Sequence, residues 1–92
     1  MLGVFFKRSV DQVDYDIDFS RWLPDGDTIQ GATAAAQPSD SMVSVPRVLV
    51  DGDTVKVWVI DGVSGKTASV LVTATTAGNR VKQVAFQIRV KD

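Results

Sequence analysis

The sequence predicts an all-β protein: an immunoglobulin-like, antiparallel two-sheet β-sandwich of about seven short strands. Three observations support this fold class. All eleven acidic residues are Asp and none is Glu, and Asp favours turns and caps over helix interiors. Several segments alternate apolar and polar residues, which is typical of strands with one buried face. Turn signals separate these segments roughly every 8–12 residues, as expected for a sandwich, with a small barrel as the alternative.

The chain begins with an apolar run and a regular strand. Leu2–Phe6 is predicted to be a short strand, an edge strand or an arm. Because exposed apolar residues would be sticky, we expect this run to dock either on its own domain or on a neighbouring subunit. Val13–Ser20 alternates strictly and is predicted to be a strand. Its core side would hold Val13, Tyr15, Ile17 and Phe19.

The next segments are predicted from their turns. Pro24 and Asp25-Gly26 end the first regular strand. Thr28–Gln37 contains three consecutive Ala, but its β-branched residues favour a strand, with Gly31 as a possible bulge.

Two short strand pieces follow, Ser41–Pro46 and Arg47–Val50. Pro46 separates them and suggests an edge position. Asp51-Gly52 predicts a hairpin into Thr54–Ile60. Both faces of Thr54–Ile60 are apolar, so its inward face is left open.

The last two segments form the clearest predicted hairpin. Lys66–Thr76 and Arg80–Val90 alternate regularly and flank the tight turn Ala77-Gly78-Asn79. We expect residues 1–12 to form an N-terminal arm or edge strand, and residues 13–92 to form a single immunoglobulin-like domain.

Composition excludes several classes of function. The chain has no Cys and no His, which removes the usual zinc ligands and the usual general base of a hydrolase. We therefore expect no enzyme, no catalytic residue and no cofactor. No segment approaches the roughly 20 apolar residues of a membrane helix, so no membrane partner is expected. The net charge is −1, and a short basic row near the C-terminus is too weak a signal to predict nucleic-acid binding.

The run of Asp residues has part of the spacing of a calcium-binding loop. Asp14, Asp16, Asp18 and Asp25 occupy the first, third, fifth and twelfth places of a calcium-loop pattern. The sixth place, however, requires Gly and holds Phe19, and a strand would space same-face carboxylates about 7 Å apart. We expect no metal site and interpret these residues as a solvent-facing row, with calcium as the weaker alternative.

The charges and the apolar N-terminus indicate surfaces for protein contacts. Residues 1–53 carry nine Asp against four basic residues, and residues 54–92 carry two Asp against six. An acidic half and a basic half suit complementary surfaces, although solvated surface is the simpler interpretation. The candidate protein-interface residues are Val4, Phe5, Phe6, Arg80, Lys82 and Arg89.

Three segments resemble a family of small structural proteins of tailed bacteriophages and prophages, the fiber-tail adaptor or neck/tail proteins. They are DYDIDFSRWLPDGDTI (14–29), VLVDGDTVKVWVIDG (48–62) and TATTAGNRVKQVAFQIRVKD (73–92). The family pattern is D-Y-x-I-D-(W/F)-S-x-W-L followed by G-D-T-I, then V-W-L, then I-T-T-A-G-G-R before a final strand ending in x-F-x-I-R-V. The matching positions are Asp14, Tyr15, Ile17, Asp18, Phe19, Ser20, Trp22, Leu23, Gly26, Asp27, Thr28, Ile29, Val57, Trp58, Val59, Thr75, Thr76, Ala77, Gly78, Arg80, Phe86, Ile88, Arg89 and Val90.

This resemblance implies a virion structural protein with an immunoglobulin-like fold and no catalytic centre. It implies an adaptor in the neck, tail or fiber-attachment region that contacts other virion proteins, forms a homo-oligomer in the particle, and is made and assembled in the bacterial host cytoplasm. The alternative is a surface-binding module in which Trp22 or Trp58 stacks on a glycan, with or without calcium. For both Trp residues we expect packing in the core or at a strand corner.

Overall fold

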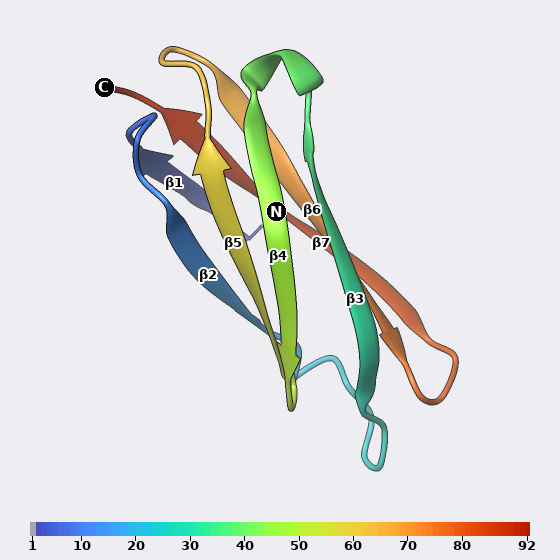
Figure 1. The fold of residues 1–92 in the computed structure, drawn as a ribbon. Helices are drawn as coiled ribbons and strands as arrows, with labels where there is room; N and C mark the ends of the chain where they lie inside the picture. Colours follow the sequence, from blue (N-terminus) through green and yellow to red (C-terminus); the bar gives the residue numbers. More distant parts are fainter. Residues whose placement is uncertain (1) are drawn as a thin grey trace.

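Two β-sheets face each other in the computed structural model, which describes residues 2–92 (Figure 1). The strands are β1 (Val4–Lys7), β2 (Val13–Asp18), β3 (Ile29–Gln37), β4 (Val43–Asp51), β5 (Thr54–Asp61), β6 (Thr67–Thr76) and β7 (Val81–Val90). A short 3-10 helix, η1 (Ser39–Ser41), joins β3 to β4. The predicted two-sheet sandwich is confirmed.

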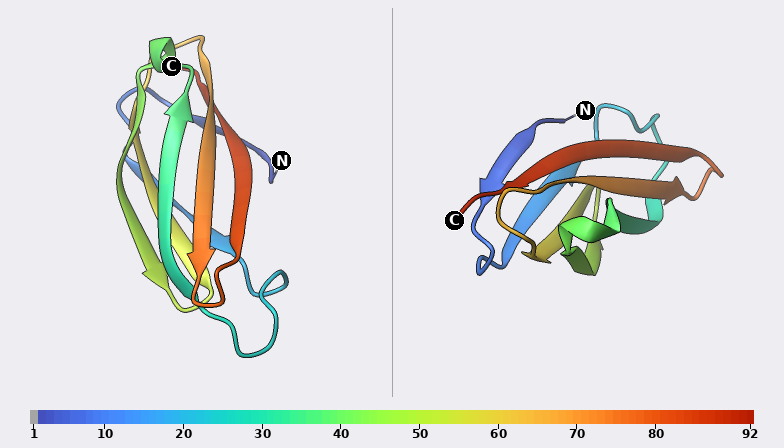
Figure 2. Two further views of the ribbon diagram at one scale, coloured as in Figure 1. Left: turned by 90° about the vertical axis from the view of Figure 1, so that its right-hand side faces the viewer. Right: turned by 90° about the horizontal axis from the view of Figure 1, so that it is seen from above.

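The strand order is of the immunoglobulin type. One sheet has the order β1-β7-β6-β3 and the other β2-β5-β4, and Figure 2 shows them as two layers. Constant-type immunoglobulin domains divide their strands 1-2-5-4 and 3-6-7, so this fold differs only in that the first strand lies beside the last. β1 is parallel to β7, whereas the other pairs are antiparallel. The prediction of a purely antiparallel sandwich is therefore corrected at this one pair.

The alternating strands supply the core. Val55, Val57 and Val59 are fully buried on β5, which settles the inward face that the sequence left open. Lys56, Trp58 and Ile60 lie half-buried on the outer face of that sheet. From the opposite sheet, β6 and β7 contribute to the core the buried residues Ala68, Val70, Val72, Ala74, Phe86, Ile88 and Val90.

Two irregularities occur where the sequence predicted them. The register between β3 and β6 shifts between Ile29 and Gly31, which confirms the bulge. The two predicted pieces around Pro46 form one strand, β4, whose register against β5 shifts between Ser44 and Arg47. β4 is an edge strand, as predicted. The predicted start at Ser41 is wrong, because Ser41 belongs to η1, where its amide and its hydroxyl both donate to the carbonyl of Pro38.

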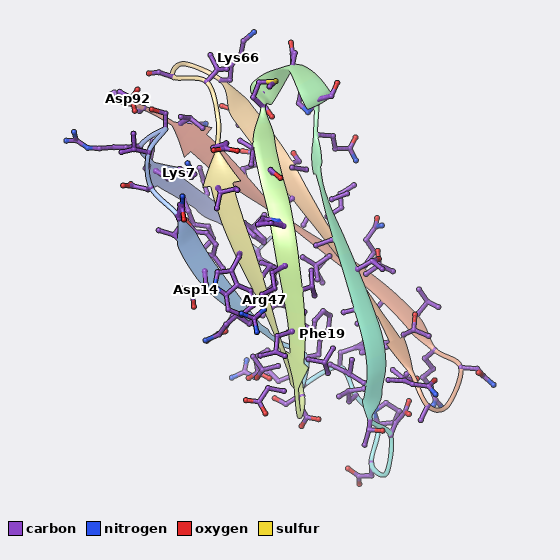
Figure 3. All side chains as sticks on the ribbon, viewed as in Figure 1. Lys7, Asp14, Phe19, Arg47, Lys66 and Asp92 are labelled. Carbon is purple, nitrogen blue, oxygen red and sulfur yellow. The ribbon has the colours of Figure 1, made fainter. Side chains whose placement is uncertain are left out.

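The molecule is elongated, with extents of 44 × 18 × 18 Å. Side chains cover both sheets along this length, with Lys7 and Asp92 at one end and Phe19 towards the other (Figure 3). Along one long side β3 contacts β4, whereas β1 and β2 lie on the opposite long side. Among residues 2–92, no helix is both long enough and apolar enough to span a bilayer.

Candidate functional site

The N-terminal run docks on its own chain as β1. Its residues Val4 to Lys7 are in register with Gln87 to Val90 of β7, and the amide of Leu2 donates to the carbonyl of Ala85 at 2.7 Å. Three of the candidate interface residues stay accessible on this strand: Val4 is 42% exposed, Phe5 39% and Phe6 65%.

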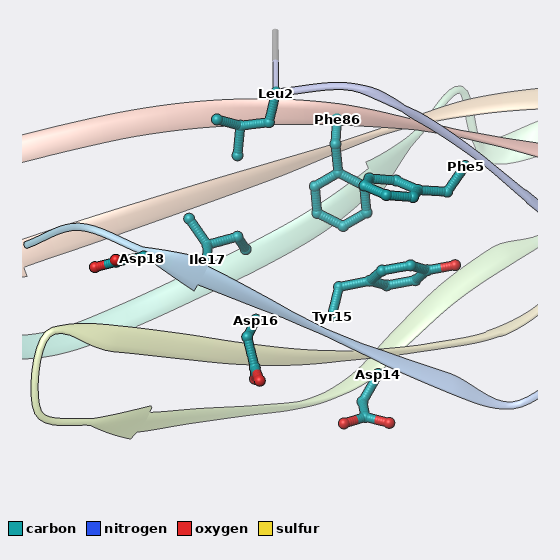
Figure 4. Close-up of a pocket in the computed structure, with 8 residues that line it drawn as sticks. All are labelled: Leu2, Phe5, Asp14, Tyr15, Asp16, Ile17, Asp18 and Phe86. Carbon is teal, nitrogen blue, oxygen red and sulfur yellow. The ribbon is translucent and has the colours of Figure 1, made fainter.

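Phe5 belongs to an aromatic cluster between the two sheets. Its ring centroid lies 4.9 Å from that of Tyr15 on β2 and 5.8 Å from that of Phe86 on β7, and Tyr15 and Phe86 are 5.3 Å apart. These rings line an open cleft of about 410 Å³ together with Leu2 and Ile17 (Figure 4). Burial, with a smaller contribution from Asp11, raises the pKa of Tyr15 above its ordinary value. The cleft is therefore an apolar, aromatic hollow at the β1–β2 side of the sandwich.

The row of Asp residues borders the same cleft. Asp14, Asp16 and Asp18 alternate with the inward residues of β2 and are exposed. The ammonium of Lys56 on β5 lies 3.3 Å from the Asp14 carboxylate and 3.8 Å from that of Asp16. The Asp18 carboxylate accepts a hydrogen bond from the Ser20 amide at 2.8 Å. Bonding by the backbone and side chain of Ser20 lowers the pKa of Asp18.

The four carboxylates of the calcium alternative do not converge. Asp14, Asp16 and Asp18 follow one strand, and Asp25 lies in the loop between β2 and β3. No group of three or more acidic side chains that could hold a metal ion is found in the described part of the chain, residues 2–92. Asp14, Asp16 and Asp18 therefore form a charged face of β2.

At the end of the sandwich that carries Lys7, hydrogen bonds join the segment that follows β1 to Asp92. Lys7 is 3% exposed, and its ammonium donates to the carbonyls of Arg8 and Asp61. Burial lowers the pKa of Lys7, although Asp11, Asp61 and Asp92 oppose this shift. The Asp92 carboxylate accepts hydrogen bonds from the amide and hydroxyl of Ser9 at 2.7 and 2.9 Å. These bonds from Ser9 lower the pKa of Asp92.

At the opposite end, Asp27 joins the β2–β3 loop to the β6–β7 turn. One carboxylate oxygen accepts from the amides of Thr28 and Gly78, each at 2.9 Å, and the other lies 3.0 Å from the Arg80 guanidinium. Desolvation of Asp27 acts to raise the pKa of its carboxyl group. The pKa nevertheless lies below its ordinary value, because the carboxylate is hydrogen-bonded by the Thr76 side chain, by the Gly78 and Thr28 amides and by Arg80. The Asp27 side chain is only 6% exposed.

Gly78 is required by this arrangement, because a Cβ there would lie 2.6 Å from the Arg80 guanidinium and 3.1 Å from the Asp27 carboxylate. We call Asp27, Gly78 and Arg80 the loop clip. Sequence reasoning missed the clip, since Asp27 and Arg80 are 53 residues apart.

The candidate interface residues lie at two places along β7. Arg89 is in register with Phe6, and both line a shallow hollow of about 480 Å³ next to the C-terminus. Arg80 and Lys82 lie at the far end of β7, where Arg80 takes part in the loop clip. The structure therefore groups Arg89 with the β1 residues and separates Arg80 and Lys82 from them.

The two Trp residues have different surroundings. Trp22 packs against the core, with its ring 6.3 Å from that of Phe19, as expected. Trp58 instead lies on the outer face of the three-stranded sheet, with the Arg47 guanidinium 4.5 Å and the Lys56 ammonium 5.9 Å from its ring. Core packing is therefore wrong for Trp58, because the neighbouring Val57 and Val59 take the inward positions.

Residues 7–89 match the sequence model of the family described as podophage GP4 fiber-tail adaptor protein gp77. The chain belongs to this fiber-tail adaptor family. The match covers almost all of the sandwich, and it confirms the resemblance found in the sequence. No curated protein matches the chain.

The structure gives physical roles to residues that carried the resemblance to the fiber-tail adaptor family. Asp27 of the GDTI segment and Gly78 and Arg80 of the TTAGNR segment meet in the loop clip. Ile17, Phe19, Phe86 and Ile88 are buried core residues. The two long motifs that lie at opposite ends of the chain are therefore joined in space by one carboxylate.

Proposed function

We propose that this chain is a virion structural adaptor that links a fiber to the tail, in the neck, tail or fiber-attachment region, through protein–protein contacts. The observation that carries this proposal is membership of the fiber-tail adaptor family over residues 7–89. The partners are other virion proteins, and the chain works in the virion after synthesis and assembly in the bacterial host cytoplasm.

The contact surface we propose includes the exposed face of β1. Val4 and Phe6 are exposed on this face, Phe5 is partly exposed on the side of the aromatic cleft, and the cation Arg89 is in register with Phe6. Apolar groups next to a cation are typical of protein interfaces, which are enriched in aromatic residues and Arg. Lys82 and Arg80 supply a second basic contact point at the other end of β7, in addition to the bond between Arg80 and Asp27.

The chemistry of the chain supports a role in contacts rather than catalysis. The chain has no His and no Cys, and the two hollows described above are open to the surface. We propose that the protein has no catalytic residue, uses no cofactor, and binds neither nucleic acid nor membrane.

We further propose that several copies act together in the assembled particle. Closed symmetry is the usual arrangement of repeated structural subunits. The acidic β2 and the basic C-terminal part of the chain supply opposite charges that can meet between copies.

Co-expression tests this function. The chain is purified together with each tail and fiber protein encoded in the same phage genome, and complexes are measured by size-exclusion chromatography with light scattering. We expect a stoichiometric complex with at least one tail and one fiber protein. Phe6→Ser is expected to weaken it, whereas Met42→Ser, at a residue that is 63% exposed and lies outside the proposed contact residues, leaves it unchanged. A chain that binds none of these proteins would overturn the adaptor function.

A further inference from the structure

The outer edge of β2 has unpaired backbone groups. β2 is the last strand of its sheet, and no strand among residues 2–92 pairs with its outer side. The Phe19 amide donates to the Asp53 carbonyl at 2.9 Å, directly beyond the Asp18–Thr54 pair. Because bonded and non-bonded pairs alternate along an antiparallel ladder, Val13, Tyr15 and Ile17 bond to β5. The N–H and C=O groups of Asp14, Asp16 and Asp18 therefore point outward.

This edge lies beside the aromatic cleft. The inward side chains Tyr15 and Ile17 form one wall of the cleft, and Phe5 and Phe86 come from the opposite sheet (Figure 4). Leu2, which is 55% exposed, also lines the cleft. An extended chain placed along β2 would send every second side chain into this apolar space.

The other face of such a strand would meet the Asp row. Lys56, on the β5 side of β2, lies beside Asp14 and Asp16, and the charge of Arg21 acts on Asp18. A cation on the outer side would place Asp14 and Asp16 each between two positive charges and would give Asp18 a partner on the open side. Cross-strand pairs of opposite charge stabilise a sheet, and like charges directly opposite destabilise it.

We propose that the edge of β2 accepts an extended segment of another virion protein, whose residues alternate between apolar side chains and Lys or Arg. The apolar side chains enter the cleft of Leu2, Phe5, Tyr15, Ile17 and Phe86, and the cations lie beside Asp14, Asp16 and Asp18. This mode of binding is strand addition, in which the backbone supplies affinity and alternate side chains supply specificity. The proposal rests on the adaptor function, and it adds the surface and the chemistry of the partner.

A second copy paired symmetrically through β2 fits this edge poorly. Two antiparallel β2 strands would place their Asp rows opposite one another, which is repulsive. The edge of β4, by comparison, is interrupted by Pro46 and a register shift, which are common devices against strand pairing. The edge of β2 (Val13–Asp18) is uninterrupted over its six residues.

One pair of variants isolates the backbone edge. Asp16→Pro removes an N–H that points outward, so it leaves the bonds to β5 intact while the ring blocks an added strand. Asp16→Ala removes the same carboxylate and keeps the N–H. The probe is a capped, fluorescent peptide of about seven residues, an ordinary strand length, with alternating Val and Lys. Its control has the same composition, with the Lys and Val residues in separate blocks.

Binding is measured by fluorescence anisotropy. We expect the alternating peptide to bind the wild-type chain more tightly than the block peptide does. Asp16→Ala should weaken this binding about two- to fivefold, because an exposed charge contributes little. Asp16→Pro should weaken it at least about tenfold further, through lost strand hydrogen bonds and steric exclusion. Equal affinities for the two peptides, or for the two variants, would overturn the proposal.

Hydrogen exchange on the wild-type chain gives a second readout if Asp16→Pro does not fold. We expect the amides of Asp14, Asp16 and Asp18 to become protected when the alternating peptide binds. Unchanged exchange at all three contradicts strand addition. Self-association of the wild type that protects these amides, with no effect of peptide, would assign the edge to a second copy and also overturn the proposal.

The complexes with tail and fiber proteins separate this inference from the adaptor function. If Asp16→Pro and Asp16→Ala bind these proteins equally well, the edge is not the site although the adaptor function stands. If the wild-type chain binds none of them, the adaptor function itself fails.

Discussion

The two long sides of the sandwich are built differently. On one side β3 contacts β4, and both strands pack partly buried residues against the core: Ala32, Ala34, Ala36, Val43, Val45, Val48 and Val50. On the other side β1 covers only the Gln87–Val90 part of β7. An aromatic cleft of about 410 Å³ remains there beside β2.

The difference concerns how each edge is protected. A regular strand edge invites pairing with another chain, and proteins interrupt such edges with Pro, bulges or cover. The β3–β4 side has a bulge at Gly31, and Pro46 lies in the irregular part of β4. β2 has neither and is bordered by an apolar hollow. The sandwich therefore closes its core along one side and leaves the other side suited to contacts.

The largest expected effect is on the core beneath the open side. Phe86 is 1% exposed and its ring contacts those of Phe5 and Tyr15. Phe86→Ala should lower the free energy of unfolding by about 3–5 kcal/mol, through lost burial and the cavity left behind. Urea denaturation followed by tryptophan fluorescence measures the change.

Phe6→Ala is the matched control for that variant, since Phe6 is 65% exposed. It should change the free energy of unfolding by no more than about 0.5 kcal/mol. Equal losses for the two variants would mean that the aromatic cluster is a surface feature and contributes nothing special to the core.

The second-largest expected change in stability is on the side of the sandwich where β3 contacts β4, which we call the closed side. Ala34 faces the core on β3 opposite Val72, and its small side chain suits the close approach of β4. Ala34→Leu should force the two sheets apart on this side and lower the free energy of unfolding by about 1–3 kcal/mol. Ala35→Leu, at an exposed neighbouring position, is the control in chemical denaturation. A stabilised Ala34→Leu would reveal unfilled space between β3 and β4 instead of tight packing.

The strands and the core were predictable because they depend on local patterns. Strict alternation identified β2 with its buried face and β6 and β7 as a hairpin, and Pro46 identified β4 as an edge. The fold class and the family were also found from the sequence. The inward face of β5 was not predictable, because both faces of this strand carry apolar residues. Val55 and Val57 lie on one face and Trp58 and Ile60 on the other, and only packing against the opposite sheet decides which face is buried.

The elements of the candidate site were less predictable, because they depend on contacts between distant residues. The aromatic cluster needs Phe5, Tyr15 and Phe86 from three strands. The parallel pairing of β1 with β7 has no local signal, and the choice between docking in the same chain or on a neighbour stayed open. Asp27 had the pattern of a turn residue, and nothing local indicated Gly78 or Arg80 as its partners.

The loop clip should give the protein a specific dependence on acid. Asp27 has a pKa below its ordinary value of 3.8 in the folded chain. A lowered carboxyl pKa stabilises the fold fully above the unfolded value, and this stabilisation is lost as pH falls through the folded pKa. Asp27→Asn should therefore unfold at a lower temperature than the wild type at neutral pH, and the difference should shrink below pH 3.8. Thermal unfolding followed by circular dichroism from pH 7 to about pH 2 measures this.

Asp25→Asn is the control for the clip, because Asp25 is exposed in the same loop and the substitution changes the charge equally. It should leave the acid dependence unchanged. Parallel acid dependence in the wild type and Asp27→Asn would show that the clip does not anchor the β6–β7 turn to the start of β3.

The smallest expected change in the free energy of unfolding is at the edge of β4, on the side where β3 contacts β4. The variant at this edge is also the most direct test of the difference between the two sides. Pro46 is exposed on β4, and Pro46→Thr adds a backbone donor there. The free energy of unfolding should change by no more than about 0.5 kcal/mol, while sedimentation velocity should detect association beyond that of the wild type. Asp16→Pro makes the opposite change on β2 and should not add association. If Pro46→Thr associates no more than the wild type, the register shift between Ser44 and Arg47 is itself sufficient to protect this edge. The two sides then differ in the shape of their edge strands, and the proline does not cause the difference.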